Sequence, residues 1–342
     1  MKGRLALAAA GLAALLAPLS RGAVERWYST GVYPRIQAPL THVSNLVPVA
    51  LLDVAAAAGL AAILVVVLRR RRDGGWGRAL LRTGGSLVWT AIAGYLVFLL
   101  LWGLNYRRVP LAEKIDYERS RITPEAAVAF ADTSARALNA GFREARPPAW
   151  ELRALAAPFG EVQRQLGAAR EAVPGVPKRS LLTLYFRRAA IDGMTDPFFL
   201  EIIVNPDVLP VERPFVVAHE WAHLAGYADE ADANFVAWLT CLKGDPLARY
   251  SGWMAAYEQA MRVLPREARR RVTPLDAGPA GDLRAIAERY RRSSPAVRQA
   301  ARGVYDQYLR ANRVAEGIDS YDAVLRLMLG TRVDADWTPR RR

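Results

Sequence analysis

Long apolar runs are confined to the first third of the chain. Three such runs cover residues 5–19, 46–68 and 87–104. Helices over the second and third runs would be roughly 34 and 27 Å long, close to the ~30 Å thickness of a hydrocarbon core. Aromatic residues near both ends of the third run are typical of a membrane interface. The pattern therefore predicts three transmembrane helices.

The first run is compatible with a cleaved signal peptide or with a retained anchor. Lys2 and Arg4 precede it, and no clear small-residue cleavage motif follows it. We favour the anchor on this ground. Asp53 is the one charge in the second run, where a charge is costly, and this indicates a functional or helix-packing role.

Basic residues predict the orientation of these spans. The connection 69–86 carries six arginines against Asp73 alone, which is typical of a cytoplasmic loop. Three crossings then place everything after residue 104 outside the cytoplasm. We therefore expect a multi-pass protein of the cytoplasmic (inner) membrane, with a membrane region at 1–104 and an extracytoplasmic domain at 105–342.

The second region is mainly helical in pattern. Two short apolar or β-branched runs interrupt it, and we expect strands there, at 181–186 and 199–204. Gly226 breaks the periodicity of one helix that begins near Arg213. The other helices are expected at about 123–144, 152–172, 230–243, 246–263, 281–313 and 320–329.

Composition and charge exclude several classes of protein. The chain has 342 residues, with one cysteine and three histidines. A lone Cys241 excludes a disulfide scaffold and any site built from several cysteines, and we expect it to pack in a core. The net charge of +14 comes largely from the membrane region, because the remaining 238 residues hold 36 basic and 30 acidic side chains. No basic stripe is interleaved with stacking aromatics, so we expect contact with membrane lipid and no nucleic acid.

The chemistry is concentrated in one helical stretch, His219-Glu220-Trp221-Ala222-His223. Spacing of i and i+4 puts both imidazoles on one helical face, where they can share one Zn²⁺. Glu220 is rotated about 100° from His219 on the helix, beside the metal rather than on it. There it can take a proton from metal-bound water and pass it to a leaving amine. The residues before His219 are apolar, so we expect this helix to be buried.

A catalytic zinc needs a third protein ligand and one open position. Asp229 has the spacing of the third ligand in metzincins, with Asp in place of His. Glu230 has the position of the gluzincin ligand, with Asn234 one turn on to support it. We favour Glu230 because Asp229 is a natural N-cap for the helix that begins there. Asp232 is expected to point away from the site and to be solvated.

These residues carry a family resemblance. The chain resembles bacterial membrane-anchored proteins that are known mainly as a domain of unknown function and classed as gluzincin-like zinc metallopeptidases. The metal motif of that family is followed by Glu-x-x-x-Asn, matched here by Glu230 and Asn234, and the prenyl-protein endopeptidases look similar locally. This sequence departs from the family at Asp232, where relatives usually have Glu, and at Asp229. The resemblance covers 105–111, 214–241, 249–253, 308–312 and 320–321.

Other polar residues are weaker candidates. Tyr227, Tyr250 and Tyr257 could donate to the oxyanion of a tetrahedral intermediate, although each also fits ordinary packing. The predicted strand 199–204 precedes the metal helix, as does the edge strand that binds substrate backbone in zincins. His42, in the first external loop, is expected at the surface.

Together these features predict a mostly α-helical chain, in which three transmembrane helices precede an α+β zincin-like domain of gluzincin type. We expect a zinc metalloendopeptidase in which His219, His223 and Glu230 hold Zn²⁺ and Glu220 is the general base. Its substrate would be a peptide or protein of the cell envelope. One rival is a non-enzymatic, zinc-stabilised envelope or sensor module, whose metal would be coordinated by four protein ligands and would have no open position. A prenyl-endopeptidase-type intramembrane protease is disfavoured, because His219 lies 115 residues beyond Leu104 and no later run is long enough to span.

Overall fold

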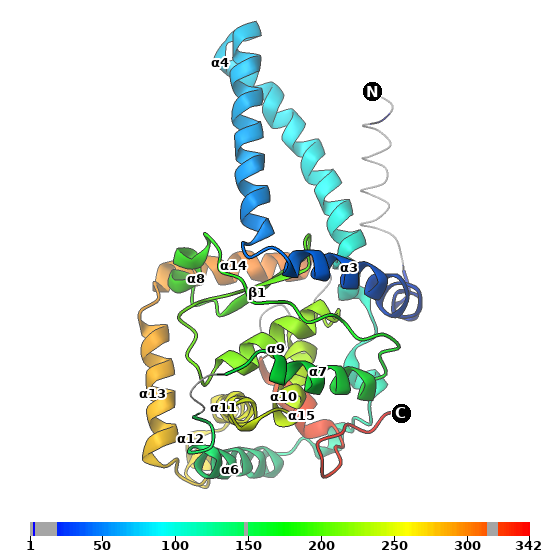
Figure 1. The fold of residues 1–342 in the computed structure, drawn as a ribbon. Helices are drawn as coiled ribbons and strands as arrows, with labels where there is room; N and C mark the ends of the chain where they lie inside the picture. The colour runs from blue at the N-terminus through cyan, green and yellow to red at the C-terminus, as the bar shows by residue number, and fades with distance from the viewer. Residues whose placement is uncertain (1–2, 4–18, 147–149, 313–320) are drawn as a thin grey trace.

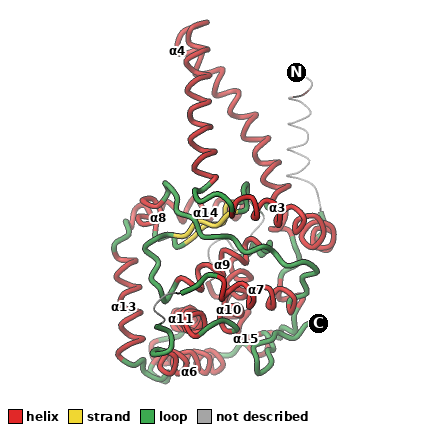
Figure 2. The backbone as a smooth tube through the Cα atoms, in the orientation of Figure 1, coloured by secondary structure: helices red, strands yellow, loops and turns green. Residues whose placement is uncertain are grey.

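A helical hairpin stands on a compact helical body (Figure 1). The computed structural model describes residue 3 and residues 19–146, 150–312 and 321–342. Residues 5–18 of the first predicted span lie outside the described residues. The described chain is mostly helical, with one small sheet (Figure 2). The predicted helical character is therefore confirmed.

The hairpin is formed by α4 (Leu51–Leu101), which rises from the body and returns to it (Figure 1). Two parts of it, Leu51–Arg72 and Gly75–Leu101, are long and apolar enough to cross a membrane. The chain takes a positive φ of 75° at Gly75, a conformation that glycine adopts without strain. Few side chains of either part are buried, unlike those of an apolar helix in a soluble core.

Residues 21–45, expected as an external loop, are helical and pack on the body. They form α2 (Arg21–Ala23), the π-helix η1 (Val24–Val32) and α3 (Tyr33–Asn45). The Tyr33 hydroxyl donates to the carbonyl of Leu224 at 2.7 Å. His42 is exposed, as expected.

The body is organised around α10 (Glu230–Leu242), whose side chains are almost all buried. It packs against α7 (Arg153–Gln165), α9 (Arg213–Leu224), α11 (Pro246–Val263) and α15 (Tyr321–Gly330). The other described helices of the body are η2 (Gly103–Arg107), α5 (Leu111–Lys114), η3 (Arg119–Arg121), α6 (Pro124–Gly141), α8 (Thr183–Ala189), α12 (Arg266–Arg269), α13 (Ala277–Arg291) and α14 (Pro295–Ala311).

The sheet has two antiparallel strands, β1 (Gly193–Asp196) and β2 (Glu201–Val204). In their register Gly193 pairs with Val204 and Asp196 pairs with Glu201. An isolated parallel bridge from Lys178 to Ile203 lies along β2. Among the described residues β1 is therefore the edge strand.

The predicted strand at 181–186 is wrong, because this segment leads into helix α8. Its buried positions, Phe186 and Ala189, are three residues apart and lie on one helical face. The long predicted helix at 281–313 is also divided. Ser294 accepts a hydrogen bond from the amide of Val297, and Pro295 begins a new helix, α14.

Asp53 lies in the first turn of α4, at the very start of the first apolar segment rather than in its middle. Its carboxylate accepts hydrogen bonds from the Ser180 hydroxyl at 2.7 Å and from the Leu181 amide at 2.8 Å. The sequence indicated a functional or helix-packing role for Asp53 but did not reveal its partner. The partner is the loop that leads into α8.

Candidate metal centre

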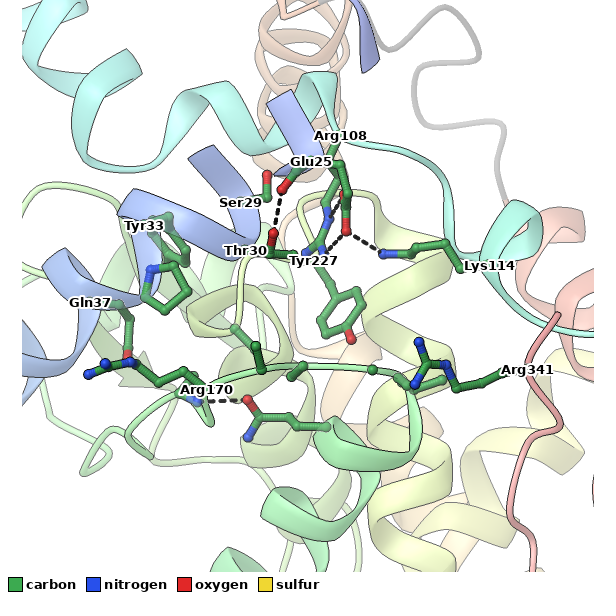
Figure 3. Close-up of a pocket in the computed structure, with 18 of the residues that line it drawn as sticks. Glu25, Ser29, Thr30, Tyr33, Gln37, Arg108, Lys114, Arg170, Tyr227 and Arg341 are labelled. Atoms are coloured by element: carbon green, nitrogen blue, oxygen red, sulfur yellow. Dashed lines mark hydrogen bonds and ion pairs between the residues drawn. The ribbon is translucent and has the colours of Figure 1, made fainter. Parts of the chain in front are cut away.

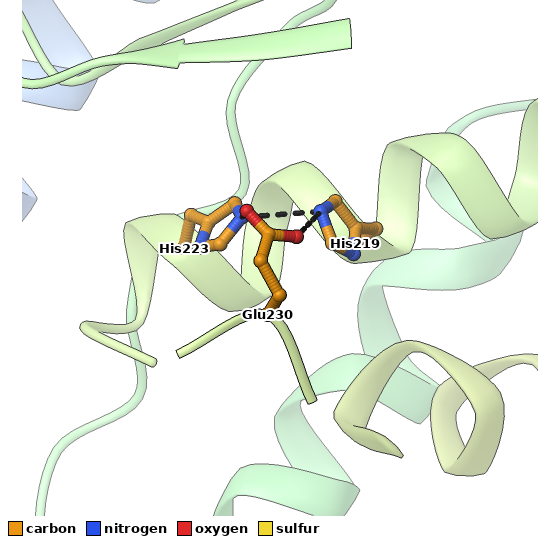
Figure 4. A group of neighbouring side chains, drawn as sticks. All are labelled: His219, His223 and Glu230. Atoms are coloured by element: carbon orange, nitrogen blue, oxygen red, sulfur yellow. Dashed lines mark hydrogen bonds and ion pairs between the residues drawn. The ribbon is translucent and has the colours of Figure 1, made fainter. Parts of the chain in front are cut away.

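The ligand motif lies at the junction of α9 and α10. His219 and His223 are one turn apart on α9, and Glu230 is the first residue of α10. Gly226 lies between the helices with a positive φ of 81°. This turn folds α10 back against α9 and brings the three side chains together (Figure 4).

The spacing of the three side chains fits one tetrahedral metal ion. The Nε2 atoms of His219 and His223 lie 3.1 Å apart. Glu230 Oε2 lies 3.3 Å from His219 Nε2, and Glu230 Oε1 lies 3.7 Å from His223 Nε2. Ligand atoms bound to Zn²⁺ at tetrahedral angles lie about 3.3 Å from one another. Among the described residues, this is the group of three His, Cys, Asp or Glu side chains whose donor atoms converge in this way.

A backbone carbonyl orients His223. Its Nδ1 lies 2.7 Å from the carbonyl oxygen of Tyr227, which can only accept, so Nδ1 donates. The lone pair of the neutral ring is then on Nε2, the nitrogen that faces the cluster. Asn234, expected to support Glu230, donates its amide to the Glu230 backbone carbonyl at 2.8 Å. It therefore holds the start of α10 rather than the carboxylate.

Tyr305 is a contact that the sequence did not indicate. Its hydroxyl donates to Glu230 Oε1 from α14, 75 residues further along the chain. No local spacing connects α14 with the metal motif, so only the tertiary fold reveals this neighbour.

The electrostatics of the cluster favour a cation. Burial raises the pKa of Glu230, but the hydrogen bond and charge of the neighbouring histidines outweigh it and lower the pKa to about 2. Burial lowers the pKa of His219, but Glu230 outweighs it and raises the pKa to about 9. Burial, followed by the charge of His219, lowers the pKa of His223 to about 4. A divalent ion bound at this cluster would compete with a proton on His219.

Glu220 faces strand β1. The hydroxyl of Thr195 donates to Glu220 Oε2 at 2.7 Å. A Cβ on Gly193 would lie 2.6 Å from Glu220 Oε1, so any larger residue there would displace the Glu220 carboxylate. Burial raises the pKa of Glu220 to about 7. The strand beside the candidate base is therefore β1, whereas the sequence assigned this place to 199–204.

The two other acidic candidates lie elsewhere. Asp229 caps α10, accepting hydrogen bonds from the amides of Ala231 and Asp232 at 2.8 and 3.2 Å. Asp232 is buried, and the expectation that it is solvated was wrong. Its carboxylate accepts a hydrogen bond from the Leu111 amide at 3.1 Å, and burial raises its pKa to about 7.

The three candidate tyrosines have other contacts. The ring of Tyr227 lies 4.8 Å from the guanidinium of Arg108, and Tyr250 donates to Asp282 at 2.5 Å. Tyr257 packs against the apolar core. Cys241 is buried, as expected.

A cavity of about 350 Å³ lies beyond the turn that follows α9 (Figure 3). Tyr227 forms part of its wall, and Glu25 pairs there with Arg108 and Lys114 at 2.9 and 3.0 Å. None of the three clustered side chains lines it. The cavity is therefore separate from the candidate metal centre.

Comparison with known proteins places the chain in a family without assigning an activity. The family described as "Protein of unknown function (DUF3810)" matches residues 28–329, most of the chain. No curated protein and no solved structure matches this chain. The chain belongs to the DUF3810 family.

Proposed function

We propose that this chain is a membrane-anchored, zinc-dependent metalloendopeptidase. The observation that carries the proposal is the convergence of His219, His223 and Glu230, with donor atoms 3.1–3.7 Å apart. Two imidazoles and one carboxylate are a donor set typical of catalytic zinc.

The cluster also fits a site with an open position. It supplies three protein ligands, whereas a purely structural zinc is usually closed by four. The side chains of His219 and Glu230 are 17% and 28% exposed, so a small molecule can approach. When bound, Zn²⁺ would polarise the scissile carbonyl and make a water molecule more acidic.

Glu220 is the proton carrier in this proposal. Its carboxylate accepts a hydrogen bond from Thr195. The charge of Glu220 raises the pKa of His219, and the charge of Glu230 raises the pKa of Glu220. Glu220 accepts a proton from the attacking water and returns it to the leaving amine. Thr195 is a positioning residue, because its hydroxyl limits the orientations open to that carboxylate.

The free edge of β1 provides a place for the substrate backbone. Thr195 is part of this strand, so a peptide added along the edge would lie beside Glu220. The active site would lie in a zincin-like domain outside the cytoplasm, held to the cytoplasmic membrane by the hairpin. The arginines at 69–86 support this orientation.

Glu220→Gln tests the proposal. The variant removes the basic carboxylate but keeps the size of the side chain, so we expect it to fold and to bind zinc like the wild type. Chelator-sensitive cleavage of a mixed peptide library should fall by about 10²–10⁴-fold. Glu258→Gln is the control, because Glu258 is also largely buried but is not in the cluster.

Two outcomes would contradict the proposal. Cleavage that survives unchanged in Glu220→Gln would refute the assigned base. Stoichiometric zinc in a wild-type protein that cleaves neither peptides nor membrane proteins would favour the non-enzymatic, zinc-stabilised module.

A further inference from the structure

Both ends of the hairpin form hydrogen bonds with elements that contain or adjoin the candidate site. At the start of α4, the amides of Leu51 and Leu52 donate to the carboxylate of Glu201 on β2, at 3.0 and 2.9 Å. At its end, Trp102 donates its Nε1 proton to the backbone carbonyl of His223 at 2.9 Å. One of these contacts is thus made directly with a candidate metal ligand.

These contacts place the site close to the membrane surface. Trp102 directly follows Leu101, the last residue of the second apolar segment. The Trp102 ring lies edge-on to the His223 ring, with centroids 6.2 Å apart. The polar headgroup layer of a bilayer is about 5–8 Å thick on each side of the hydrocarbon core. Phe98 and Leu99, in the last turn of α4, are already buried in the body, so the candidate metal centre lies just beyond the layer of lipid headgroups.

The adjoining surface of the body is apolar. Leu181 and Leu184 beside and within α8, and Val304 on α14, are 82%, 59% and 68% exposed. Helices α8 and α14 pack together on the side of the body from which the hairpin rises (Figure 1). The Leu181 amide donates a hydrogen bond to Asp53 in the first turn of α4. Exposed apolar side chains in this position are suited to contact with lipid.

The sheet beside Glu220 is part of the same arrangement. Ala50, just before α4, packs with Ile203 of β2 and Phe186 of α8. Met194 of β1 lies against this small core. A peptide paired with the free edge of β1 would therefore lie next to the base of the hairpin.

We propose that the substrates are polypeptides tethered to the same membrane and cut at bonds close to the bilayer surface. This inference rests on the proposed peptidase function. A tethered chain leaves the bilayer close to the site, and its anchor raises its effective concentration there. A soluble polypeptide has neither advantage.

Tether length tests this inference. Full-length protein would be placed in vesicles of phosphatidylcholine and phosphatidylglycerol. Single-span substrates would carry the same randomised peptide window about 5, 20 or 40 residues from the bilayer, with a soluble copy of the window as control. We expect chelator-sensitive cleavage to be at least about tenfold faster at the shortest tether than at the longest. Equal rates for all tethers and for the soluble copy would overturn the inference and leave the peptidase function intact. Absence of cleavage in every substrate would overturn both.

A second measurement tests the placement without relying on proteolysis. Cys241 is the chain's one cysteine and is buried, so Leu184→Cys introduces a thiol that can be labelled alone. Lipids with a headgroup quencher should quench a fluorophore at position 184. The same label in Glu267→Cys should stay bright, because α12 lies at the opposite end of the body (Figure 1). Equal quenching at both positions would overturn the membrane-facing placement.

Discussion

Adjacent acidic residues at the start of α10 have different roles. The carboxylate of Asp229 accepts from the first amides of the helix, whereas that of Glu230 lies 3.3 Å from His219 Nε2. The N-cap residue has an extended backbone and the next residue has a helical one, so their side chains leave the helix in different directions. One residue of sequence therefore separates the cap from the candidate ligand.

This difference leads to a prediction about metal binding. Glu230→Ala should lose most bound zinc, because it removes one of three ligands. Asp229→Ala should keep the zinc and lose about 1 kcal/mol of stability with its cap. Metal analysis of the purified variants, with wild type as reference, measures both. Loss of zinc from Asp229→Ala but not from Glu230→Ala would favour the metzincin arrangement.

A buried carboxyl in β1 predicts a pH dependence of stability. Asp196 accepts hydrogen bonds from the amides of Phe198 and Phe199, yet burial raises its pKa from 3.8 to about 6. The folded state thus binds this proton more tightly than the unfolded state. Its contribution to stability is complete below pH 4 and is lost as the pH rises through 6, by about 3 kcal/mol. In urea unfolding, the free energy of unfolding should fall less between pH 4 and pH 7 for Asp196→Asn than for wild type. If it falls equally in both proteins, the prediction is contradicted.

The positions of the site residues were predictable only where they depend on local spacing. The His-Glu-x-x-His motif and the cap at Asp229 are local, and the structure places these residues as their spacing suggests. Thr195 and Tyr305 reach the site from distant segments, and the Leu111 amide contacts the buried Asp232. Tertiary contacts of this kind leave no periodic signal in the sequence.

At the scale of elements, periodicity identified helices better than strands. The helix predicted from Thr123 begins at Pro124, where the Thr123 hydroxyl accepts from the Ala126 amide. Strand β1 contains Gly193 and Asp196, residue types that are rare in strands, and was not predicted. Its place in the sheet depends on β2 and on the close approach to Glu220.

The junction between the hairpin and the sheet contains a buried ion pair. Lys178 Nζ lies 2.7 Å from Glu201 Oε2, and both side chains are almost inaccessible. The same carboxylate accepts from the Leu51 and Leu52 amides. Glu201 is therefore shared between the sheet and the start of α4.

This junction predicts a difference between single and double variants. Lys178→Met should destabilise the protein by about 3–5 kcal/mol, because Glu201 is left buried without its cation. Adding Glu201→Gln should recover part of this loss, because no unpaired charge remains buried and the amide oxygen can still accept from one of the two α4 amides. Urea unfolding of both variants measures the difference. A double variant as unstable as the single one would show that the buried charge is not the cause.

At the scale of the whole molecule, the hairpin determines which parts share a side of the membrane. It leaves the body at Leu51 and returns at Leu101, and residues 21–45 pack on the same body. If both apolar segments cross the bilayer, these residues and the body lie on one side and the arginine-rich turn lies on the other. This conclusion holds whether or not the first apolar run is cleaved.

The arginines then predict the sidedness. Short loops rich in arginine are retained in the cytoplasm, so the turn of the hairpin should be cytoplasmic and the body extracytoplasmic. A reporter that is active only outside the cytoplasm should work when fused after residue 110 and be silent when fused at residue 75. Replacing the arginines at 69–72 with alanine should weaken this asymmetry, whereas replacing those at 269–271, in the body, should leave it intact. A reporter active at residue 75 and silent after residue 110 would place the body in the cytoplasm, because both positions report on the same pair of crossings.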